Sequence, residues 1–375
     1  MGTLNSEIQT NTVLLHDWLT GFRGGERVLE AFCELFPQSP LYTLIYVPGS
    51  TSALIENRKI VASFLSKIPH IEDHYRKFLP LFPMAAESID IEEPAKLVLS
   101  SSHCVIKGVE KPPGAVHISY IHSPMRYLYD QFDSYFGSHA PLYQQWGAKA
   151  CRGYLTQWDI DSNKNVDFMI ANSKFVQERI KKYYHRDSTV IHPFVDLKDF
   201  RARQQTALQK KDFYLMVTAF APNKRVDLAI EAFNLLKKPL KIIGSGQQEA
   251  WLKNMAGPNI EFLGNLSRKD VTGLMSEARG FIFPGVEDFG ITPLESLASG
   301  TPVIAFEAGG VLETLNEETA FFFKQQTVDS LVEAVKDFER RDYTKELLYA
   351  RAENFSKELF QTRIKGFIDE ALNLK

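Results

Sequence analysis

The chain has 375 residues, 44% of them hydrophobic and 24% charged, so it is long enough for two or three domains that each bury a core. A formal net charge of −3 provides no basic field for nucleic acid. Cys33, Cys104 and Cys151 lie far apart in apolar or helical contexts, which predicts reduced thiols and excludes a disulfide framework. Because no apolar run is long enough to span a bilayer and no signal peptide is recognised, we expect a cytoplasmic protein.

The first segment predicts a strand, a glycine loop and a helix. Residues 12–16 form a short apolar strand, the loop contains Gly24 and Gly25, and an amphipathic helix covers 26–36. In doubly wound folds this arrangement cradles a phosphate, although the glycine spacing of a dinucleotide site is missing. The two glycines therefore either contact a phosphate or only permit tight packing of the helix on the strand.

Residues 58–84 combine basic and apolar side chains. Such a segment rests on an anionic membrane surface, or else forms an amphipathic helix that covers the sheet of the first domain. Its basic residues are Lys59, Lys67, Arg76 and Lys77, and its apolar ones are Phe64, Leu65, Phe78, Leu79, Leu81 and Phe82.

Two further strands, 96–101 and 116–121, have the nearly continuous apolar character of buried parallel strands. Polar clusters follow both, the first around His103 and the second from His122 to Tyr127. Ligands collect beyond the carboxyl ends of such strands, so both clusters are expected to face one crevice. His122 directly follows its strand and is a candidate for catalysis, with a structural hydrogen bond as the alternative.

The segment 141–165 predicts a helix that contains Asp159 and Asp161. These aspartates resemble part of a calcium loop, but the central glycine and closing glutamate of that loop are missing. We interpret them as the polar end of the helix and expect no metal. A strand at 166–171 follows, Ser173 caps a helix over 174–184, and 189–192 forms a short strand.

Residues 197–212 are polar and predict a linker, after which strands and helices alternate again as in a second parallel sheet. The predicted strands are 213–218, 240–243, 260–263, 280–284, 303–306 and 319–323. The predicted helices are 225–236, 247–254, 269–277, 293–299, 328–339, 343–354 and a final one at 360–372.

Two loops of this second half carry candidate anion-binding groups. Lys224 and Arg225 stand at the start of a helix, where cations are unfavourable unless an anion joins them. A bound phosphate explains the pair, and two solvated surface cations are the alternative. Gly244 and Gly246 form a tight turn after a strand, which by itself is typical of turn geometry more than of ligand contact.

The segment from Phe281 to Gly310 combines a strand, a polar loop and a helix. Glu287 and Glu295 lie on either side of Gly290 and Pro293, and Pro293 suits the first turn of a helix. Helix-start amides attract anions while carboxylates accept hydrogen bonds from sugar hydroxyls. This combination predicts a site for a phosphorylated sugar, whereas either glutamate alone would be typical of a surface charge or a cap.

These motifs resemble the retaining glycosyltransferases of the GT-B fold, in the group one (family four) type. The Glu-x7-Glu signature from Glu287 to Glu295, the segment 298–303 and the pair Gly309-Gly310 carry the resemblance. The first half is similar to bacterial mannosyltransferases that build O-antigen and other polysaccharides, through residues 16–19, 23–26, 101–103 and 122–127.

The resemblance implies an α/β fold of two Rossmann-like domains with parallel sheets that face each other across a cleft, and a C-terminal helix that crosses back. The domains would be 1–196 with 356–375, and 197–355. Glu295 would hold the nucleotide ribose, Glu287 would approach the donor sugar, Lys224 would neutralise the diphosphate and His122 would lie near the reacting sugar.

Further positions follow from the same resemblance. The donor-binding set is Gly24, Gly25, Arg225, Gly244, Gly246, Phe289, Gly290, Ile291 and Thr292, and the acceptor-side set is His16, His103, Arg126 and Tyr127. The family has an arginine five residues before the lysine, where this chain has Ala219. Arg225 is the hypothesised substitute for that charge.

The predicted function is transfer of a sugar, with retention, to a lipid-linked oligosaccharide or polysaccharide precursor. We expect mannose from GDP-mannose, no cofactor and no metal, and peripheral contact with the inner face of the cytoplasmic membrane through 58–84. Two alternatives are a sugar-nucleotide epimerase on the same fold and a non-catalytic sugar-nucleotide-binding module, since fold alone does not decide function.

Overall fold

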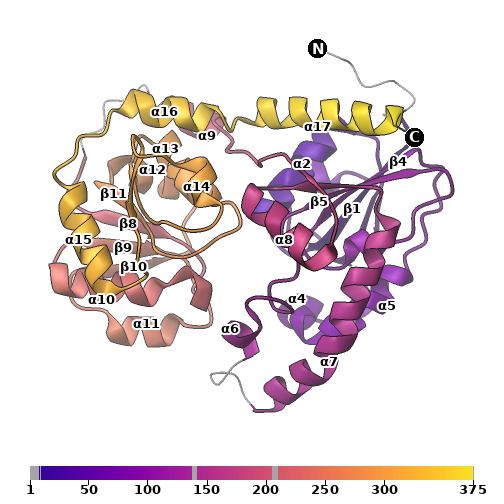
Figure 1. The fold of residues 1–375 in the computed structure, drawn as a ribbon, viewed down its shortest axis with the longest axis horizontal. Coiled ribbons are helices and arrows are strands. Elements are labelled where there is room, and N and C mark those ends of the chain that lie inside the picture. Colours follow the sequence, from indigo (N-terminus) through magenta and orange to yellow (C-terminus); the bar gives the residue numbers. More distant parts are fainter. Residues whose placement is uncertain (1–7, 9, 137–141, 205–209, 375) are drawn as a thin grey trace. The chain divides into compact units, whose positions relative to one another are not determined.

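The computed structural model describes residues 8, 10–136, 142–204 and 210–374, which form two compact units (Figure 1). The first unit comprises Met1–His192 with Phe360–Lys375, and the second comprises Pro193–Leu359. These boundaries lie a few residues from the predicted ones. The predicted linker, 197–212, belongs to the second unit, and its residues Lys198–Gln204 form a helix, α9.

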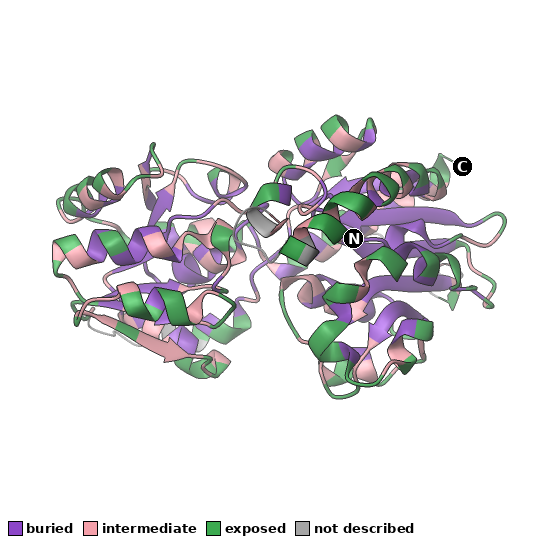
Figure 2. Ribbon diagram, turned by 90° about the horizontal axis from the view of Figure 1, so that it is seen from below, coloured by how far each residue is buried: buried purple, intermediate pink, exposed green. Residues whose placement is uncertain are grey.

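The first unit contains a parallel sheet of seven strands in the order β3-β2-β1-β4-β5-β6-β7. Its central strands β4 and β5 are buried along their whole length, and β1 is buried except at Trp18, which explains their largely apolar character (Figure 2). The strands are β1 (Thr12–Leu19), β2 (Leu41–Tyr46), β3 (Ile60–Ala62), β4 (Leu97–Ser102), β5 (Val116–Ile121), β6 (Phe168–Ala171) and β7 (Thr189–Val190). The larger helices are α2 (Gly24–Leu35), α7 (Leu142–Asp161) and α8 (Lys174–Tyr184), the last capped by Ser173 as predicted.

Strand β1 is longer than predicted, because it continues through Asp17, Trp18 and Leu19. The neighbouring strand β2 extends the pairing, with Leu19 opposite Tyr46, and Val47 N–H donates to the Leu19 carbonyl at 2.9 Å. Asp17 is therefore part of the sheet, although the sequence places it in a loop.

The stretch 58–84 is not the amphipathic helix that was one of its two predicted forms. It contains β3, two 3₁₀ helices (Phe64–Lys67 and Tyr75–Leu81) and two short helices, α4 (Ile71–His74) and α5 (Phe82–Glu87). Prolines at positions 69, 80 and 83 prevent one continuous helix, because proline lacks an N–H and restricts the residue before it. Of its apolar side chains, Leu65 and Phe82 are buried in the core.

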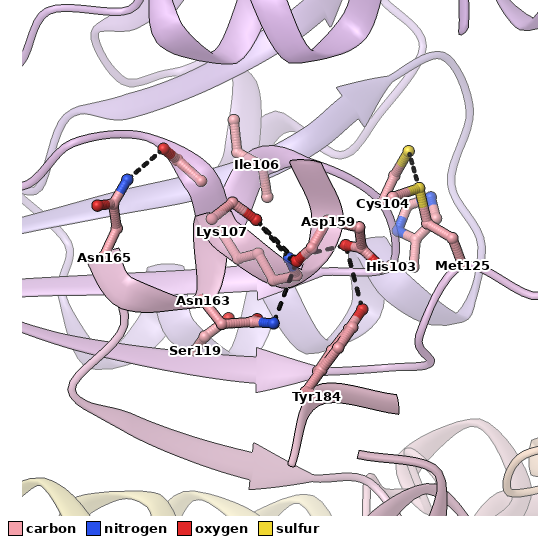
Figure 3. A network of polar contacts seen from close by, with 12 residues as sticks. His103, Cys104, Ile106, Lys107, Ser119, Met125, Asp159, Asn163, Asn165 and Tyr184 are labelled. Atoms are coloured by element: carbon pink, nitrogen blue, oxygen red, sulfur yellow. Dashed lines mark hydrogen bonds and ion pairs between the residues drawn. The ribbon is translucent and has the colours of Figure 1, made fainter. Parts of the chain in front are cut away.

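A buried ion pair joins α7 to the 3₁₀ turn after β4 (Figure 3). Lys107 Nζ lies 2.8 Å from Asp159 Oδ1 and donates to Ser162 Oγ at 2.8 Å, while Tyr129 and Tyr184 donate to the Asp159 carboxylate. Because both side chains are fully buried, these hydrogen bonds and the ion pair replace the water that each group loses. Asp159 is thus engaged in holding the helix.

The second unit contains a parallel sheet of six strands in the order β10-β9-β8-β11-β12-β13. The strands are β8 (Tyr214–Val217), β9 (Leu240–Ile243), β10 (Ile260–Gly264), β11 (Gly280–Phe283), β12 (Val303–Phe306) and β13 (Ala320–Phe323). The helices are α9, α10 (Val226–Leu236), α11 (Glu249–Met255), α12 (Arg268–Glu277), α13 (Ile291–Ala298), α14 (Val311–Thr314), α15 (Val328–Phe338) and α16 (Lys345–Glu353). The predicted alternation of strand and helix is confirmed.

The last helix, α17 (Lys357–Asn373), returns to the first unit from Phe360 onward. Phe360 stacks on Phe32 with ring centroids 6.0 Å apart and meets Tyr120 edge to face. The C-terminal helix therefore completes the core of the first unit. Within the described ranges, no helix is both long enough and apolar enough to cross a membrane.

Candidate functional site

In the second unit, the loops after β8 and β11 place Lys224 against Glu287. The two strands are neighbours in the sheet, and Lys224 Nζ lies 2.6 Å from Glu287 Oε1. Gly285 makes this approach possible, since a Cβ there would lie 2.5 Å from the Asn223 carbonyl oxygen. The predicted cation and the predicted sugar-binding carboxylate are thus brought into direct contact.

Arg225 follows Lys224 but turns elsewhere. Its backbone is in the left-handed region (φ 51°), its guanidinium contacts the Asp227 carboxylate at 3.1 Å, and Nη1 donates to Gln326 Oε1 at 3.0 Å. In this structure the anions beside the two cations are carboxylates of the chain itself, Glu287 for Lys224 and Asp227 for Arg225. The bound phosphate stays a prediction, as does its alternative, two solvated surface cations.

The loop from Glu287 to Gly290 presents the start of α13. Gly290 has φ 89° and precedes the helix, so the amides of Ile291 and Thr292 lie in its first turn, next to Pro293. Phe289 is only 4% exposed and its ring meets Phe355, so its side chain belongs to the core.

The Gly309-Gly310 turn packs against the loop that contains Glu287. Gly310 N–H donates to the Glu287 carbonyl at 2.9 Å, and a Cβ on Gly310 would lie 2.1 Å from the Asp288 carbonyl oxygen. Gly309 has φ 83° and similarly leaves no room for a side chain beside Glu287. Because these two residues are glycines, their backbone can lie against the backbone of Glu287 and Asp288 and hold this part of the loop in place.

Glu295 has a partner that the sequence analysis missed. Arg268 Nη1 lies 2.6 Å from Glu295 Oε1, and Arg268 Nε donates to Asp199 at 3.0 Å. Burial opposes the charge of Arg268, but the two carboxylates outweigh it and raise the pKa of the guanidinium. Arg268 is the first residue of α12, so a cation at a helix start was the signal that could have identified it.

Gly244 and Gly246 are explained by packing. A Cβ on Gly244 (φ 138°) would lie 1.8 Å from the Thr218 carbonyl oxygen, and one on Gly246 would lie 2.6 Å from that of Phe220. The loop after β9 therefore lies directly against the loop after β8. This observation supports the turn interpretation of these glycines.

In the first unit three histidines converge: His16 lies within β1, and His103 and His122 directly follow β4 and β5. His16 Nδ1 lies 3.1 Å from Ser101 Oγ, which lies 2.8 Å from His122 Nε2. The His103 ring lies 6.0 Å from that of His16 and 6.2 Å from that of His122. The crevice residues predicted from separate strands thus form one cluster, because β4 pairs with both β1 and β5.

Asp17 anchors one edge of this cluster. Its carboxylate accepts the backbone N–H groups of His103, Cys104 and Ile106 at 2.6 to 2.9 Å, and lies 3.2 Å from His103 Nδ1. The His103 ring also meets Trp18 edge to face at 4.3 Å. The Asp17 carboxylate therefore holds the turn after β4 and orients His103.

The electrostatics of the cluster favour neutral rings at His103 and His122. Burial lowers the pKa of His122 well below its usual value, and charge on His103 and His16 lowers it further. Burial also lowers the pKa of His103, although the Asp17 carboxylate opposes that effect. A neutral imidazole has one donor and one acceptor nitrogen, so both histidines are suited to accept a hydrogen bond from a hydroxyl group.

Helix α2 closes the other edge. Glu26 is buried, its Oε2 accepts the Arg23 N–H at 2.8 Å, and its Oε1 lies 3.8 Å from His16 Nε2. A Cβ on Gly25 would lie 3.5 Å from the His16 ring and 3.9 Å from His122 Nε2, so the backbone at Gly25 packs against both histidines. Gly24 is the first residue of the helix.

The remaining acceptor-side residues, Arg126 and Tyr127, have different surroundings. Tyr127 turns into the core, where its hydroxyl lies 2.8 Å from Cys104 Sγ and burial raises its pKa. Arg126 remains close enough to His103 for its charge to lower the pKa of that histidine. The structure therefore groups His16, His103 and His122 with Arg126 and assigns the Tyr127 side chain to packing.

A possible metal-ligand group is present at α4. Among the residues described, His70, Glu72 and Asp73 offer three ligand atoms within 4.8 Å of one another, and all three are exposed. None of the predicted site residues takes part in it.

Residues 198–357, nearly the whole second unit, match the family model of the glycosyl transferases group 1. The second unit is a glycosyl transferase group 1 domain. Its Glu287–Glu295 loop and its Lys224 contact are therefore features of a glycosyltransferase domain.

Several curated relatives of this domain are mannosyltransferases. The human alpha-1,3/1,6-mannosyltransferase ALG2 is 26% identical over 55% of this chain and 59% of its own. The O-antigen chain mannosyltransferase C of Escherichia coli is 27% identical over 56% and 60%. A GDP-mannose-dependent phosphatidylinositol monomannoside mannosyltransferase of Corynebacterium glutamicum is 30% identical over 45% and 51%. The chain thus spans a little over half the length of the curated relatives it matches.

Solved structures resemble the chain over nearly its whole length. Sucrose-phosphate synthase from Thermosynechococcus elongatus superposes with a TM-score of 0.74 at 17% identity, covering 97% of this chain and all of that one. Anabaena HepE in complex with UDP and glucose gives 0.66 at 14% identity, covering 96% and 99%. At these identities the likeness shows the fold, which is GT-B as the sequence analysis predicted.

Proposed function

We propose that the protein is a retaining glycosyltransferase that moves mannose from GDP-mannose to a lipid-linked oligosaccharide or polysaccharide precursor of surface glycans. The contact between Lys224 and Glu287 carries this proposal. It sets a cation and a carboxylate side by side, next to the first turn of α13, in a glycosyl transferase group 1 domain. A cation with helix-start amides suits a diphosphate, while a carboxylate suits the hydroxyls of the attached sugar.

The reaction is a displacement at the anomeric carbon of the donor sugar. The bond from that carbon to the diphosphate oxygen breaks, and a bond to an acceptor hydroxyl oxygen forms on the same face. The acceptor proton passes to the leaving diphosphate. Negative charge grows on the diphosphate as it leaves, so Lys224 and the amides of Ile291 and Thr292 lower the barrier by stabilising that charge.

The carboxylates and the histidine bind and orient in this proposal. Glu287 accepts hydrogen bonds from the donor sugar, and Glu295, oriented by Arg268, accepts them from the ribose. His122 meets the reacting sugar with a neutral imidazole. The proposal includes no metal ion and assigns the stabilisation of the diphosphate charge to Lys224 and the amides of Ile291 and Thr292.

The choice of mannose and guanosine rests on relatives. Several of them are named mannosyltransferases, and the corynebacterial one is named for GDP-mannose. The O-antigen enzyme of Escherichia coli is the basis for proposing a saccharide precursor as the acceptor.

A thermal-shift panel of GDP, UDP, ADP and their sugars tests the donor. A ligand at one hundred times its dissociation constant stabilises the protein by about 2.7 kcal/mol, and GDP should raise the melting temperature most. A second experiment incubates the protein with GDP-mannose and a lipid-linked acceptor and determines the product and the configuration of its new linkage. An inverted linkage contradicts retention, conversion of donor without acceptor indicates an epimerase, and binding without any conversion indicates a binding module.

Peripheral membrane contact is part of the same proposal. We assign it mainly to helix α7 and not, as the sequence predicted, to residues 58–84. In 58–84, Met84 is 55% exposed, whereas on the neighbouring helix α7 Trp146 is 75% and Leu142 72% exposed. Trp158 Nε1 donates to Glu87 at 2.6 Å, which ties α7 to α5. Residues 142–157 include no acidic residue, and Lys149 is exposed, whereas Arg152 donates to the Leu128 and Tyr129 carbonyls. Lys149 and the exposed apolar side chains therefore suit an anionic bilayer.

Sedimentation with vesicles tests this contact. The protein should sediment with phosphatidylglycerol-containing vesicles, and Trp146→Ser should weaken that binding several-fold. Trp251→Ser is the matched control, because Trp251 is also exposed (49%) but lies in the second unit. Equal sedimentation with neutral and anionic vesicles, or equal loss in both variants, would refute the contact.

A further inference from the structure

Four residues of the first unit form a buried polar series, which we call the histidine network: Glu26, His16, Ser101 and His122. In it, one hydroxyl group lies between two imidazole rings. Ser101 Oγ is 3.1 Å from His16 Nδ1 and 2.8 Å from His122 Nε2. A serine has a single proton, so when it donates to one ring it must accept from the other. The position of the proton on His16 therefore determines its position on His122.

Glu26 determines which ring nitrogen of His16 carries the proton. Its Oε2 already accepts the Arg23 N–H, and its Oε1 faces His16 Nε2 at 3.8 Å. That ring nitrogen is buried and has no hydrogen-bond partner among the described residues. A carboxylate cannot donate, and at this distance it attracts an N–H electrostatically, so the favoured tautomer of His16 carries its proton on Nε2.

The consequence reaches His122 through Ser101. With Nδ1 of His16 unprotonated, Ser101 donates to it and accepts from Nε2–H of His122. Nδ1 of His122 is then the unprotonated nitrogen. In the described part of the chain no hydrogen bond uses this atom, and the side chain is partly exposed.

We propose that Glu26, His16 and Ser101 are positioning residues that fix the tautomer of His122, so that its Nδ1 accepts a hydrogen bond from a substrate hydroxyl. The identity of that hydroxyl, on the donor sugar or the acceptor, rests on the proposed function. The tautomer itself is a property of the protein alone. The simpler alternative is that Glu26 only closes the first turn of α2 through Arg23 N–H.

The substitution Glu26→Gln separates these two explanations. The glutamine carbonyl can replace Oε2 and keep the hydrogen bond to Arg23 N–H, so α2 keeps its cap. Its NH2 group then faces His16 Nε2 in place of Oε1, and its positive edge favours an unprotonated Nε2. The proton of His16 moves to Nδ1, and the proton of His122 moves from Nε2 to Nδ1. The two hydrogen bonds of Ser101 are kept, but their direction is inverted.

Nitrogen-15 NMR of the imidazole rings measures this directly, because protonated and unprotonated ring nitrogens have separate chemical shifts. In the unmodified protein, without any substrate, His122 should have its proton on Nε2. In Glu26→Gln it should be on Nδ1. Glu30→Gln on the same helix is the matched control and should leave the tautomer unchanged, and Ser101→Ala combined with Glu26→Gln should match Ser101→Ala alone.

A His122 proton on Nδ1 in the unmodified protein overturns the proposal without any variant. So does an unchanged tautomer in a folded Glu26→Gln protein. In the transferase assay, Glu26→Gln should lower kcat by roughly tenfold with little change in KM, because His122 then presents an N–H where the substrate hydroxyl needs an acceptor. If the tautomer reverses but no transfer activity exists in any variant, the proposed function fails while the network stands.

Discussion

Lys224 Nζ and Glu287 Oε1 lie 2.6 Å apart, although their residues follow different strands of the second sheet. Their side chains are 18% and 20% exposed, so the pair is accessible to a ligand but partly shielded from water. A diphosphate that reaches Lys224 necessarily meets Glu287 as well. The pair therefore couples binding of the phosphate to the position of the carboxylate that would hold the sugar.

Replacing Lys224 by methionine should weaken GDP binding by roughly 10–100-fold. A hydrogen bond to a charged group contributes about 1.5–3 kcal/mol, and the variant also leaves Glu287 to repel the phosphate. Isothermal titration calorimetry measures the affinity. Lys253→Met is the matched control, because Lys253 also pairs with a glutamate, Glu249, on the same unit. Equal affinities in the two variants would remove Lys224 from the site.

Glu287→Ala should abolish most of the transfer activity while GDP binds at least as tightly as to the unmodified protein, because a negative charge beside Lys224 is removed. The carboxylate is assigned to the sugar and not to the nucleotide, so its loss acts on turnover. Initial rates with GDP-mannose and GDP titrations in parallel provide both values. Intact transfer in this variant would contradict the proposed assignment of Glu287.

Arg225→Ala tests whether this arginine replaces the charge that Ala219 lacks. If it does, the affinity for GDP should fall several-fold, since the guanidinium would move from Asp227 and Gln326 to the phosphate. Calorimetric titration with GDP measures the change. An unchanged affinity rules the substitution out and leaves Arg225 as a structural link between α10 and the loop after β13.

Arg268→Ala should destabilise the second unit, because it leaves the Glu295 charge buried without its partner. Removing one member of a buried pair costs about 3–5 kcal/mol, and the 31% exposure of Arg268 reduces this to roughly 2–3 kcal/mol. Urea unfolding measures the loss. Adding Glu295→Gln should recover part of it, because the second change removes the unpaired charge, and no recovery would contradict the pairing.

Because His117 is buried, we expect the free energy of unfolding to fall in acid. Burial lowers its pKa from 6.5 to about 4, and the Asn165 carbonyl opposes this only partly. Because the unfolded chain takes up the proton first, the contribution is complete above pH 6.5 and is lost as the pH falls towards 4, by about 3 kcal/mol.

Urea unfolding between pH 7 and pH 4 measures this linkage. His117→Asn should be less stable than the unmodified protein at pH 7, but the difference should shrink as the pH falls. His185→Asn is the control, since His185 is exposed and asparagine tolerates its left-handed backbone. A difference that stays constant with pH would refute a lowered pKa.

The sequence by itself determined the architecture and the loop that matters most. The apolar run 303–306 matches β12, because a strand buried on both faces requires a continuous apolar pattern. Ser173 and Pro293 mark helix starts through local chemistry alone. The spacing of Glu287 and Glu295 is also local, so the family could be identified without a structure.

Only the tertiary structure decided which of these groups meet. Arg268 pairs with Glu295, and Ser101 joins His16 to His122, through strands and helices whose adjacency depends on sheet order. It also decided that Gly244 is needed for packing and that Phe289 is a core residue. A pattern of residue types predicts what each side chain can do, whereas its partner is set by chain segments that are distant in sequence and become neighbours only in the folded sheet.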